Sequence, residues 1–198
     1  MPCGKYGCAQ YSIKPARVWG GYPYAGRREG ERMLSEKRRT LLVLNGAGLL
    51  ISSVFAGWLY FFFLLGAIDL WPIVTDVPVE IGGDRRAWNM AHLEGITNGL
   101  ILMGLAAAAP FVRLGPRGQT WLFWSALTFA WLFTLPAIAN AFFGTRGLEF
   151  GGGPFPGNVT INNIIFLFGW PPVLAAHSGF GLFAWGAWKH YKTLGADQ

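Results

Sequence analysis

Residues 41–68 read LLVLNGAGLLISSVFAGWLYFFFLLGAI, without a single Asp, Glu, Lys, Arg or His. A helix needs about 20 apolar residues to cross the hydrocarbon core of a membrane, so this stretch predicts a membrane-spanning helix. Charged side chains are also missing from Gly118 to Thr145 and from Phe150 to Trp188. The whole chain is 53% hydrophobic and only 13% charged, whereas a soluble domain carries about 25% charged residues. We therefore expect an integral membrane protein.

Four apolar runs predict four helices, and hence an all-α fold, an integral membrane four-helix bundle. The expected spans are residues 41–68, 90–113, 121–143 and 161–188. Pro171 and Pro172 fall inside the fourth run, and proline removes a helical hydrogen bond, so this span is expected to be kinked or to start late. The domain plan is a basic tail at 1–40, a four-span domain at 41–192 and a short C-terminal tail at 193–198.

Positive charge indicates how the helices are oriented. Of the 16 Lys and Arg residues, nine lie in residues 1–40, two in the turn RLGPRG and two after Trp188. Cytoplasmic flanks carry such an excess, so both the N- and C-termini are expected in the cytoplasm, with the long loops outside. The same distribution favours contact with the lipid bilayer surface and argues against a nucleic-acid partner. In a bacterium the protein would be a multi-pass protein of the inner (plasma) membrane.

Polar side chains gather near the outer end of this arrangement. His92, Glu94 and Asn98 lie in the outer half of the second span, and ionisable groups at membrane depth are candidates for function. Asn140, at the end of the third span, and Arg146, in the loop after it, are expected on the same side. Glu94 and Asn98 share a helix face, whereas His92 and Asn98 lie about 120° apart around the helix. His92 and Asn98 can line one pocket at different depths, but they cannot both contact one small atom without help from a neighbouring helix.

Each histidine in the spans has two interpretations. His92 either caps the helix start and bonds the loop, or ligates a metal or haem, since neutral imidazole is the commonest metal ligand. Glu94 is either an interfacial charge or a catalytic carboxylate. His177 sits deeper, where a histidine normally faces the bundle interior. It would then make a hydrogen bond between helices, or serve as a second haem ligand.

These residues resemble a known pattern. The second span contains W-x-x-A-H-x5-N-G as Trp88, Ala91, His92, Asn98 and Gly99, followed later by RGLEFG at 146–151 and GWPPVLAA at 169–176. In this order they resemble the styrene oxide isomerase family, over roughly residues 45–188. The basic N-terminal tail lies outside the resemblance.

The resemblance implies a cofactor, an assembly and a reaction. Members of the family are four-helix membrane proteins that assemble as homotrimers, bind haem b at subunit interfaces and isomerise aryl epoxides to aldehydes without net redox change. By resemblance, the 41–192 domain binds haem, His92 is the axial ligand of the iron and Asn98 lies beside the substrate. Trp88 and Arg146, from the same motifs, are assigned to the cofactor site.

One departure concerns the third span. The family has a Tyr and an Asp near the reacting group on its third helix, and residues 121–143 here contain neither. The candidate replacements are Asn140 and, from the first span, Tyr60. A relative that keeps the cofactor and the fold but acts on another substrate, with a different activity, therefore remains an alternative. So do a haem-binding electron carrier that uses His92 and His177, and a scaffold without a cofactor.

Overall fold

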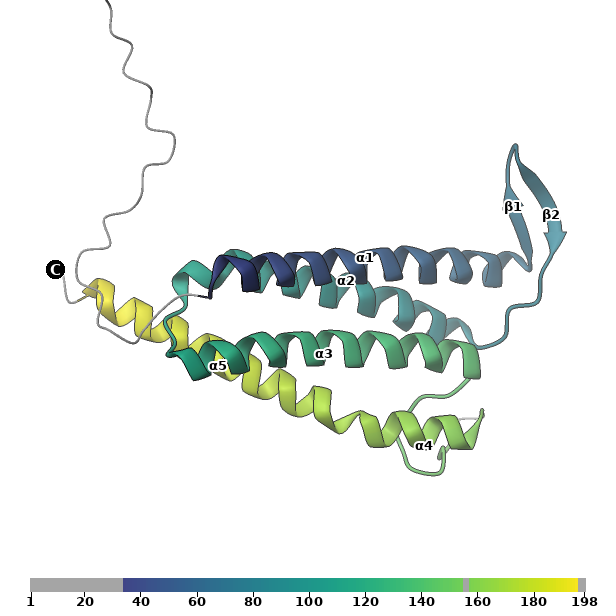
Figure 1. Cartoon of the computed structure of the whole chain (residues 1–198). Coiled ribbons are helices and arrows are strands. Elements are labelled where there is room, and N and C mark those ends of the chain that lie inside the picture. The colour runs from purple at the N-terminus through teal and green to yellow at the C-terminus, as the bar shows by residue number, and fades with distance from the viewer. Residues whose placement is uncertain (1–33, 155–156, 196–198) are drawn as a thin grey trace, which may run out of the picture.

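A computed structural model describes residues 34–154 and 157–195, and these residues are mainly helical (Figure 1). The elements are α1 (Glu36–Leu65), β1 (Ala67–Leu70), β2 (Val74–Pro78), α2 (Arg85–Ala108), the 3-10 turn η1 (Ala109–Phe111), α3 (Pro116–Phe143), α4 (Val159–Phe168) and α5 (Trp170–Gly195). Within the described ranges, four helical segments are long and apolar enough to span a membrane. The predicted all-α membrane fold is confirmed. Most of the predicted basic tail lies outside the described residues.

The first span is shifted toward the N-terminus relative to the prediction. It begins at Glu36, where the Ser35 side chain accepts a hydrogen bond from the backbone N–H of Arg38 at 3.4 Å. It ends at Leu65 because Gly66 adopts a left-handed conformation, with φ of 68°, which glycine reaches without steric cost. Ile68, predicted to be helical, instead belongs to β1, which pairs antiparallel with β2. The first long loop is therefore a hairpin.

The second span also begins earlier than expected. The Asp84 carboxylate accepts hydrogen bonds from the backbone N–H groups of Arg86 (2.8 Å) and Ala87 (3.0 Å). Such a cap satisfies donors that a helix start leaves open, so α2 starts at Arg85 rather than near Met90.

The fourth span is interrupted, as its prolines predicted. α4 ends at Phe168 and α5 starts at Trp170, with Gly169 between them. Pro171 and Pro172 have no backbone N–H to give to the preceding turn, so the hydrogen-bond ladder breaks there.

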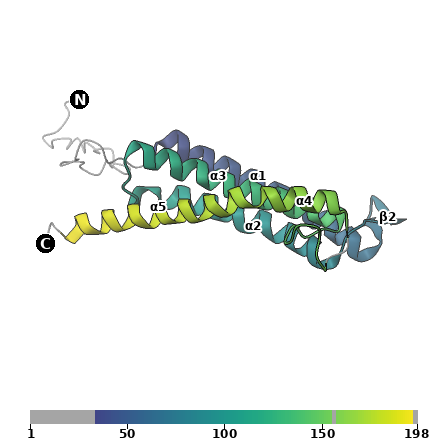
Figure 2. The ribbon, with the colours of Figure 1, turned by 90° about the horizontal axis from the view of Figure 1, so that it is seen from below.

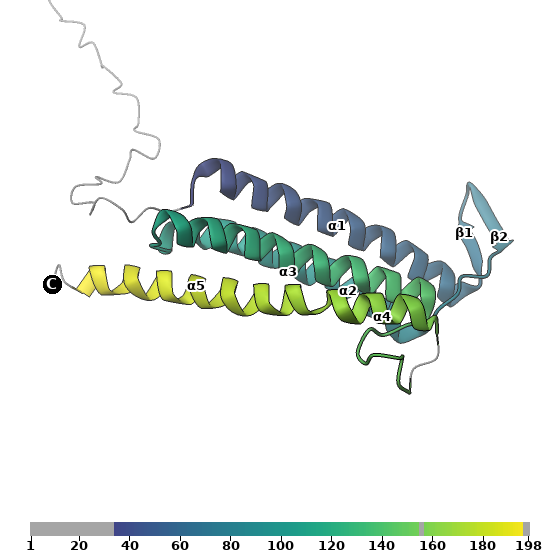
Figure 3. The same ribbon diagram turned by 60° about the horizontal axis from the view of Figure 1, so that its bottom comes forward.

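The helices pack in the order α1, α2, α3, α5. α2 contacts both α1 and α3, and α5 packs mainly against α3. Figures 1, 2 and 3 show the start of α1 and the end of α5 at one end of the molecule, called here the termini end. The β1–β2 hairpin and α4 lie at the opposite, hairpin end (Figure 1).

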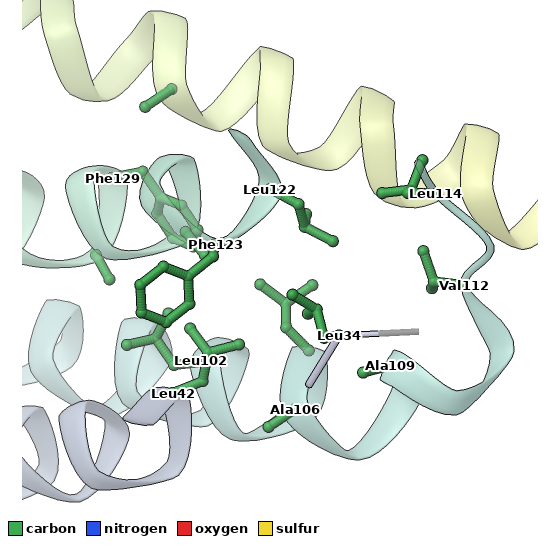
Figure 4. Packing of buried hydrophobic residues seen from close by; sticks show 14 of the residues in the cluster. Leu34, Leu42, Leu102, Ala106, Ala109, Val112, Leu114, Leu122, Phe123 and Phe129 are labelled. Atoms are coloured by element: carbon green, nitrogen blue, oxygen red, sulfur yellow. The ribbon is translucent and has the colours of Figure 1, made fainter. Parts of the chain in front are cut away.

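Two apolar clusters make up the core. The larger lies toward the termini end and includes Leu42, Leu102, Leu122 and Phe123 (Figure 4). The smaller lies toward the hairpin end and consists of Ala56, Ala87, Trp88, Ala91 and Ala141. On α1, α2 and α3, polar side chains lie between the residues of one cluster and those of the other.

Glycines bring α1 and α2 together at this polar stretch. A Cβ on Gly99 would lie 2.8 Å from the Gly46 carbonyl oxygen, and one on Gly95 would lie 2.7 Å from the Ser53 Cβ. Small residues at such spacing let membrane helices approach closely. The Gly95/Gly99 pair thus serves a contact within one chain.

A candidate cofactor and substrate site in a polar layer of the membrane domain

A layer of polar side chains separates the two apolar clusters. Ser53 lies between Leu49 and Ala56 on α1, and Thr134 lies between the clustered residues of α3. The layer, called here the polar layer, consists of Ser53, His92, Glu94, Asn98 and Thr134. Ser53 and Thr134 have no exposed surface, and Asn98 is 5% exposed, while His92 and Glu94 are half-buried. Polar groups buried at membrane depth need partners, and the contacts within the layer supply them.

The imidazole of His92 is held by α1. Its Nδ1 lies 2.9 Å from the Ser53 carbonyl oxygen, and because a carbonyl only accepts, Nδ1 carries the proton. The Ser53 hydroxyl donates to the His92 carbonyl oxygen at 2.6 Å. In a neutral ring, Nε2 then has the free lone pair, and no described residue hydrogen-bonds to it. A backbone carbonyl on the second ring nitrogen is the usual way that a protein orients a metal-ligating histidine.

Gly57 makes room for this ring. A Cβ added at Gly57 would lie 2.9 Å from both Cε1 and Nδ1 of His92, closer than side-chain atoms pack. The glycine therefore forms one wall of a cradle for the imidazole. The fit to an axial haem ligand rests on this cradle and on the free Nε2.

A single imidazole suits haem better than a bare metal ion. No group of three or more His, Cys, Asp or Glu side chains comes together among the residues that the structure describes. A protein metal site typically needs three or four such ligands, whereas haem brings four nitrogens of its own and needs only an axial ligand from the chain.

Asn98 faces α3 rather than His92. Its amide nitrogen donates to Glu94 Oε2 at 2.9 Å and to Thr134 Oγ1 at 3.1 Å, and lies 3.4 Å from the Ala130 carbonyl oxygen. The Thr134 hydroxyl donates its own proton to Ala130 at 2.8 Å, so its oxygen must accept from Asn98. This sets the amide with its nitrogen toward Glu94 and Thr134. Asn98 thus holds the Glu94 carboxylate in place.

Trp88 is fully buried in the hairpin-end cluster. Its indole N–H donates to the Gly82 carbonyl oxygen at 2.9 Å, and its ring meets Phe142 edge-on at 4.9 Å between centroids. In the single chain it anchors the start of α2, one turn before His92. Its assignment to the cofactor site stays a prediction.

Asn140, in the last turn of α3, and Arg146, in the loop after that helix, lie close together. The Asn140 amide donates to the Arg146 carbonyl oxygen at 3.4 Å and accepts from the Thr145 hydroxyl at 2.7 Å. The Arg146 guanidinium pairs with the Asp84 carboxylate, 2.9 Å from Oδ1. These contacts tie the loop to the start of α2, so both residues lie toward the hairpin end from the polar layer. Their catalytic and cofactor assignments are not tested by this geometry.

Tyr60 lies on α1 one turn beyond Gly57. It is half-buried, packs against the hairpin-end cluster and stacks on Phe63 at 6.4 Å between ring centroids. It follows Gly57, the residue that lies against the imidazole of His92, by three positions on the same helix.

The expectation that His177 faces the bundle interior is wrong. His177 is exposed on α5, and its Nδ1 bonds the Val173 carbonyl oxygen of its own helix at 2.8 Å. The buried face of α5 is instead lined by small residues such as Ala175 and Gly179, which let α5 lie close to α3. His92 is held against α1 while α5 packs against α3. One chain therefore does not bring the two imidazoles to opposite faces of one macrocycle.

Three important residues escaped sequence reasoning. Ser53, which follows Ser52, and Thr134 are hydroxyl residues in apolar runs, where such residues usually bond their own helix. Gly57 has the same appearance as other helix glycines. The pattern that could have indicated them is that all three lie against α2, the helix that carries the W-x-x-A-H-x5-N-G motif, which requires the helix pairing to be known.

The fold and its polar layer define an integral membrane protein with four spans and a histidine-containing site between α1 and α2. A family model described as styrene oxide isomerase matches residues 38–188, well over half of the chain. The chain belongs to the styrene oxide isomerase family, a family of epoxide isomerases of the membrane. Comparison with curated proteins gave no significant match.

Proposed function

We propose that the protein is a haem b-dependent isomerase that converts an aryl or other hydrophobic epoxide to an aldehyde. Family membership supports epoxide isomerisation. The observation that carries the haem assignment is the orientation of His92, whose Nδ1 is bonded to the Ser53 carbonyl oxygen and whose Nε2 is free among the described contacts. His92 would hold the iron, and Trp88 and Arg146 would stabilise the start of α2, the helix that carries His92.

The reaction needs no external electron acceptor, because opening the epoxide C–O bond is balanced by hydride migration within the substrate. When bound, ferric haem would supply Lewis-acid chemistry to the epoxide. Asn98 keeps the Glu94 carboxylate in a fixed place, where negative charge stabilises positive charge on the opening substrate. The apolar clusters on either side exclude water, which would otherwise trap the opened epoxide as a diol.

In this proposal the full site is shared between copies of the chain. His92 contacts α1, whereas Asn98 and Glu94 contact one another and α3, so one chain presents them on different sides of α2. We propose a homotrimer in which neighbouring chains complete the pocket. We also propose location in a bacterial inner membrane with both termini cytoplasmic. The start of α1 and the end of α5 lie at the same end (Figure 2), which is compatible with this orientation.

Absorption spectra of the purified protein test the haem assignment. The expected result is a Soret band of a ferric haem with one protein ligand, which shifts when an epoxide is added. His92→Ala should lose the band while the protein still inserts and elutes as wild type, and His177→Ala should keep it. A low-spin bis-histidine spectrum would identify an electron carrier instead, and a complete lack of haem would identify a scaffold.

A further inference from the structure

A groove between α1 and α2 opens at the termini end, on the far side of the larger cluster from the polar layer. It has a volume of about 430 Å³, and its lining includes Glu36, Arg39, Thr40 and Val43 of α1 with Met103 and Ala107 of α2. The first four residues follow the pattern i, i+3, i+4, i+7, so they lie along one face of the helix. The lining is polar in the first turns of α1 and apolar below.

The residues at this end of the molecule indicate that the groove lies at the depth of lipid headgroups. The same end of the molecule carries Arg113 and Arg117 before and in α3, and Lys189 and Lys192 at the end of α5. The Lys192 ammonium lies 3.8 Å from the centroid of the Trp188 ring. Tryptophan next to lysine is typical of the boundary between hydrocarbon and headgroups.

The guanidinium of Arg39 is held in place through one nitrogen, and its other two nitrogens are available to a ligand. Its Nε donates to the Ala106 carbonyl oxygen near the end of α2 at 3.1 Å, and none of the described residues bonds its two terminal nitrogens. The neighbouring Arg38 differs, because its guanidinium donates to the Thr120 hydroxyl at 2.9 Å and lies over the Phe123 ring. Arg39 thus presents a fixed cationic fork, the geometry that recognises phosphate.

Glu36 brings the opposite charge to the same groove. It lines the groove beside Arg39, yet no ion pair joins Glu36 to any residue in the described part of the chain, where the salt bridge identified is Arg146–Asp84. A carboxylate and a guanidinium that share a groove without pairing complement a ligand that carries both charges.

We propose that the groove binds a zwitterionic glycerophospholipid whose headgroup ends in a primary ammonium. Arg39 and Thr40 bind its phosphate, Glu36 accepts hydrogen bonds from its ammonium, and an acyl chain lies along Val43, Met103 and Ala107. An anionic headgroup would meet repulsion from Glu36, and a quaternary ammonium has no proton to donate to it. The site is separate from the polar layer and does not depend on the proposed isomerase activity.

Lipid binding to the delipidated, full-length protein tests the proposal. Native mass spectrometry after adding equal amounts of phosphatidylethanolamine, phosphatidylcholine and phosphatidylglycerol should show preferential retention of phosphatidylethanolamine. Arg39→Gln should weaken binding of all three about five- to tenfold, since a charge-assisted phosphate contact is lost. Glu36→Gln should retain phospholipid but lose the preference for phosphatidylethanolamine over phosphatidylcholine.

Two exposed residues provide matched controls. Arg117→Gln changes a cation at the same end of the molecule, and Glu80→Gln changes an acid near the hairpin; neither lines the groove, and both should bind lipid as wild type does. Equal retention of the three lipids by the wild-type protein would overturn the proposal, as would an Arg39→Gln variant with unchanged retention. A change of oligomeric state in Arg39→Gln in place of a change in lipid binding would assign the groove to a second copy of the chain.

Discussion

At the scale of single residues, the position of the His92 ring depends on the lack of a side chain at Gly57. Gly57→Ala would place a Cβ 2.9 Å from two atoms of the imidazole, so we expect the ring to turn away from its Ser53 bond. Disturbing the support of a ligating histidine typically weakens metal binding about 10- to 100-fold. The ratio of haem to protein after purification, measured by the pyridine haemochromogen, should fall accordingly.

Gly48→Ala is the matched control for this substitution. Its Cβ would meet Trp131 at 3.6 Å, which is an ordinary contact, and haem content should stay at the wild-type level. If Gly57→Ala kept full haem occupancy, the imidazole would not be positioned through this wall.

Asn98 has a different expected phenotype, because it holds Glu94 and Thr134 rather than His92. Asn98→Ala should keep haem and lose turnover of the epoxide about 10²- to 10³-fold, the usual cost of removing a preorganised polar group. Asn45→Ala is the comparison, since Asn45 also bridges two helices through its bond with Trp131 but lies outside the polar layer. Turnover that is equal in both variants would assign Asn98 to helix packing.

At the scale of elements, Asp84 connects the start of α2 to the loop after α3. It caps α2 and pairs with Arg146 of the loop after α3. Loss of a helix cap costs about 0.5–2 kcal/mol, whereas a partly exposed ion pair contributes at most about 1 kcal/mol. Asp84→Ala should therefore lower the free energy of unfolding in detergent by about 1–2 kcal/mol, and Asp84→Asn, which keeps the cap, by less.

Glu80→Ala serves as the control for Asp84, since Glu80 is an exposed acid in the same loop. Its unfolding free energy should match that of the wild-type protein. An Asp84→Ala variant as stable as Glu80→Ala would show that α2 does not need this cap.

At the scale of the whole molecule, the choice of substrate depends on which polar groups the helices place near the reacting atoms. α3 contains neither Tyr nor Asp, the polar groups that the resemblance places near the reacting atoms. Positioning and charge stabilisation of this kind are worth several kcal/mol. We therefore expect slow or absent turnover of styrene oxide by haem-loaded protein, although a spectral shift on binding an epoxide should persist.

Gas chromatography of the products checks this expectation, with a panel of aryl and terpenoid epoxides beside styrene oxide. Faster conversion of another epoxide would identify the preferred substrate class. Efficient formation of phenylacetaldehyde would contradict the expectation. It would show that polar groups outside α3 position the epoxide, and Tyr60 of α1 is the candidate for this role.

The amino-acid sequence by itself determined the four spans, the break in the last one, and the polar residues of α2 that define the candidate site. This was possible because insertion into a membrane depends on the hydropathy of each segment alone. The ends of the spans were less predictable, since Ser35, Gly66 and Asp84 set them through local hydrogen bonds and backbone conformation.

Only the tertiary structure decided what each polar residue contacts. The sequence contains no pairing rule that places Ser53 and Gly57 against His92, or Thr134 against Asn98. It likewise could not show that His177 faces outward, because that depends on α5 packing through small residues against α3. Inside a membrane the helices are all apolar, so their partners are chosen by close packing and hydrogen bonds between residues distant in sequence.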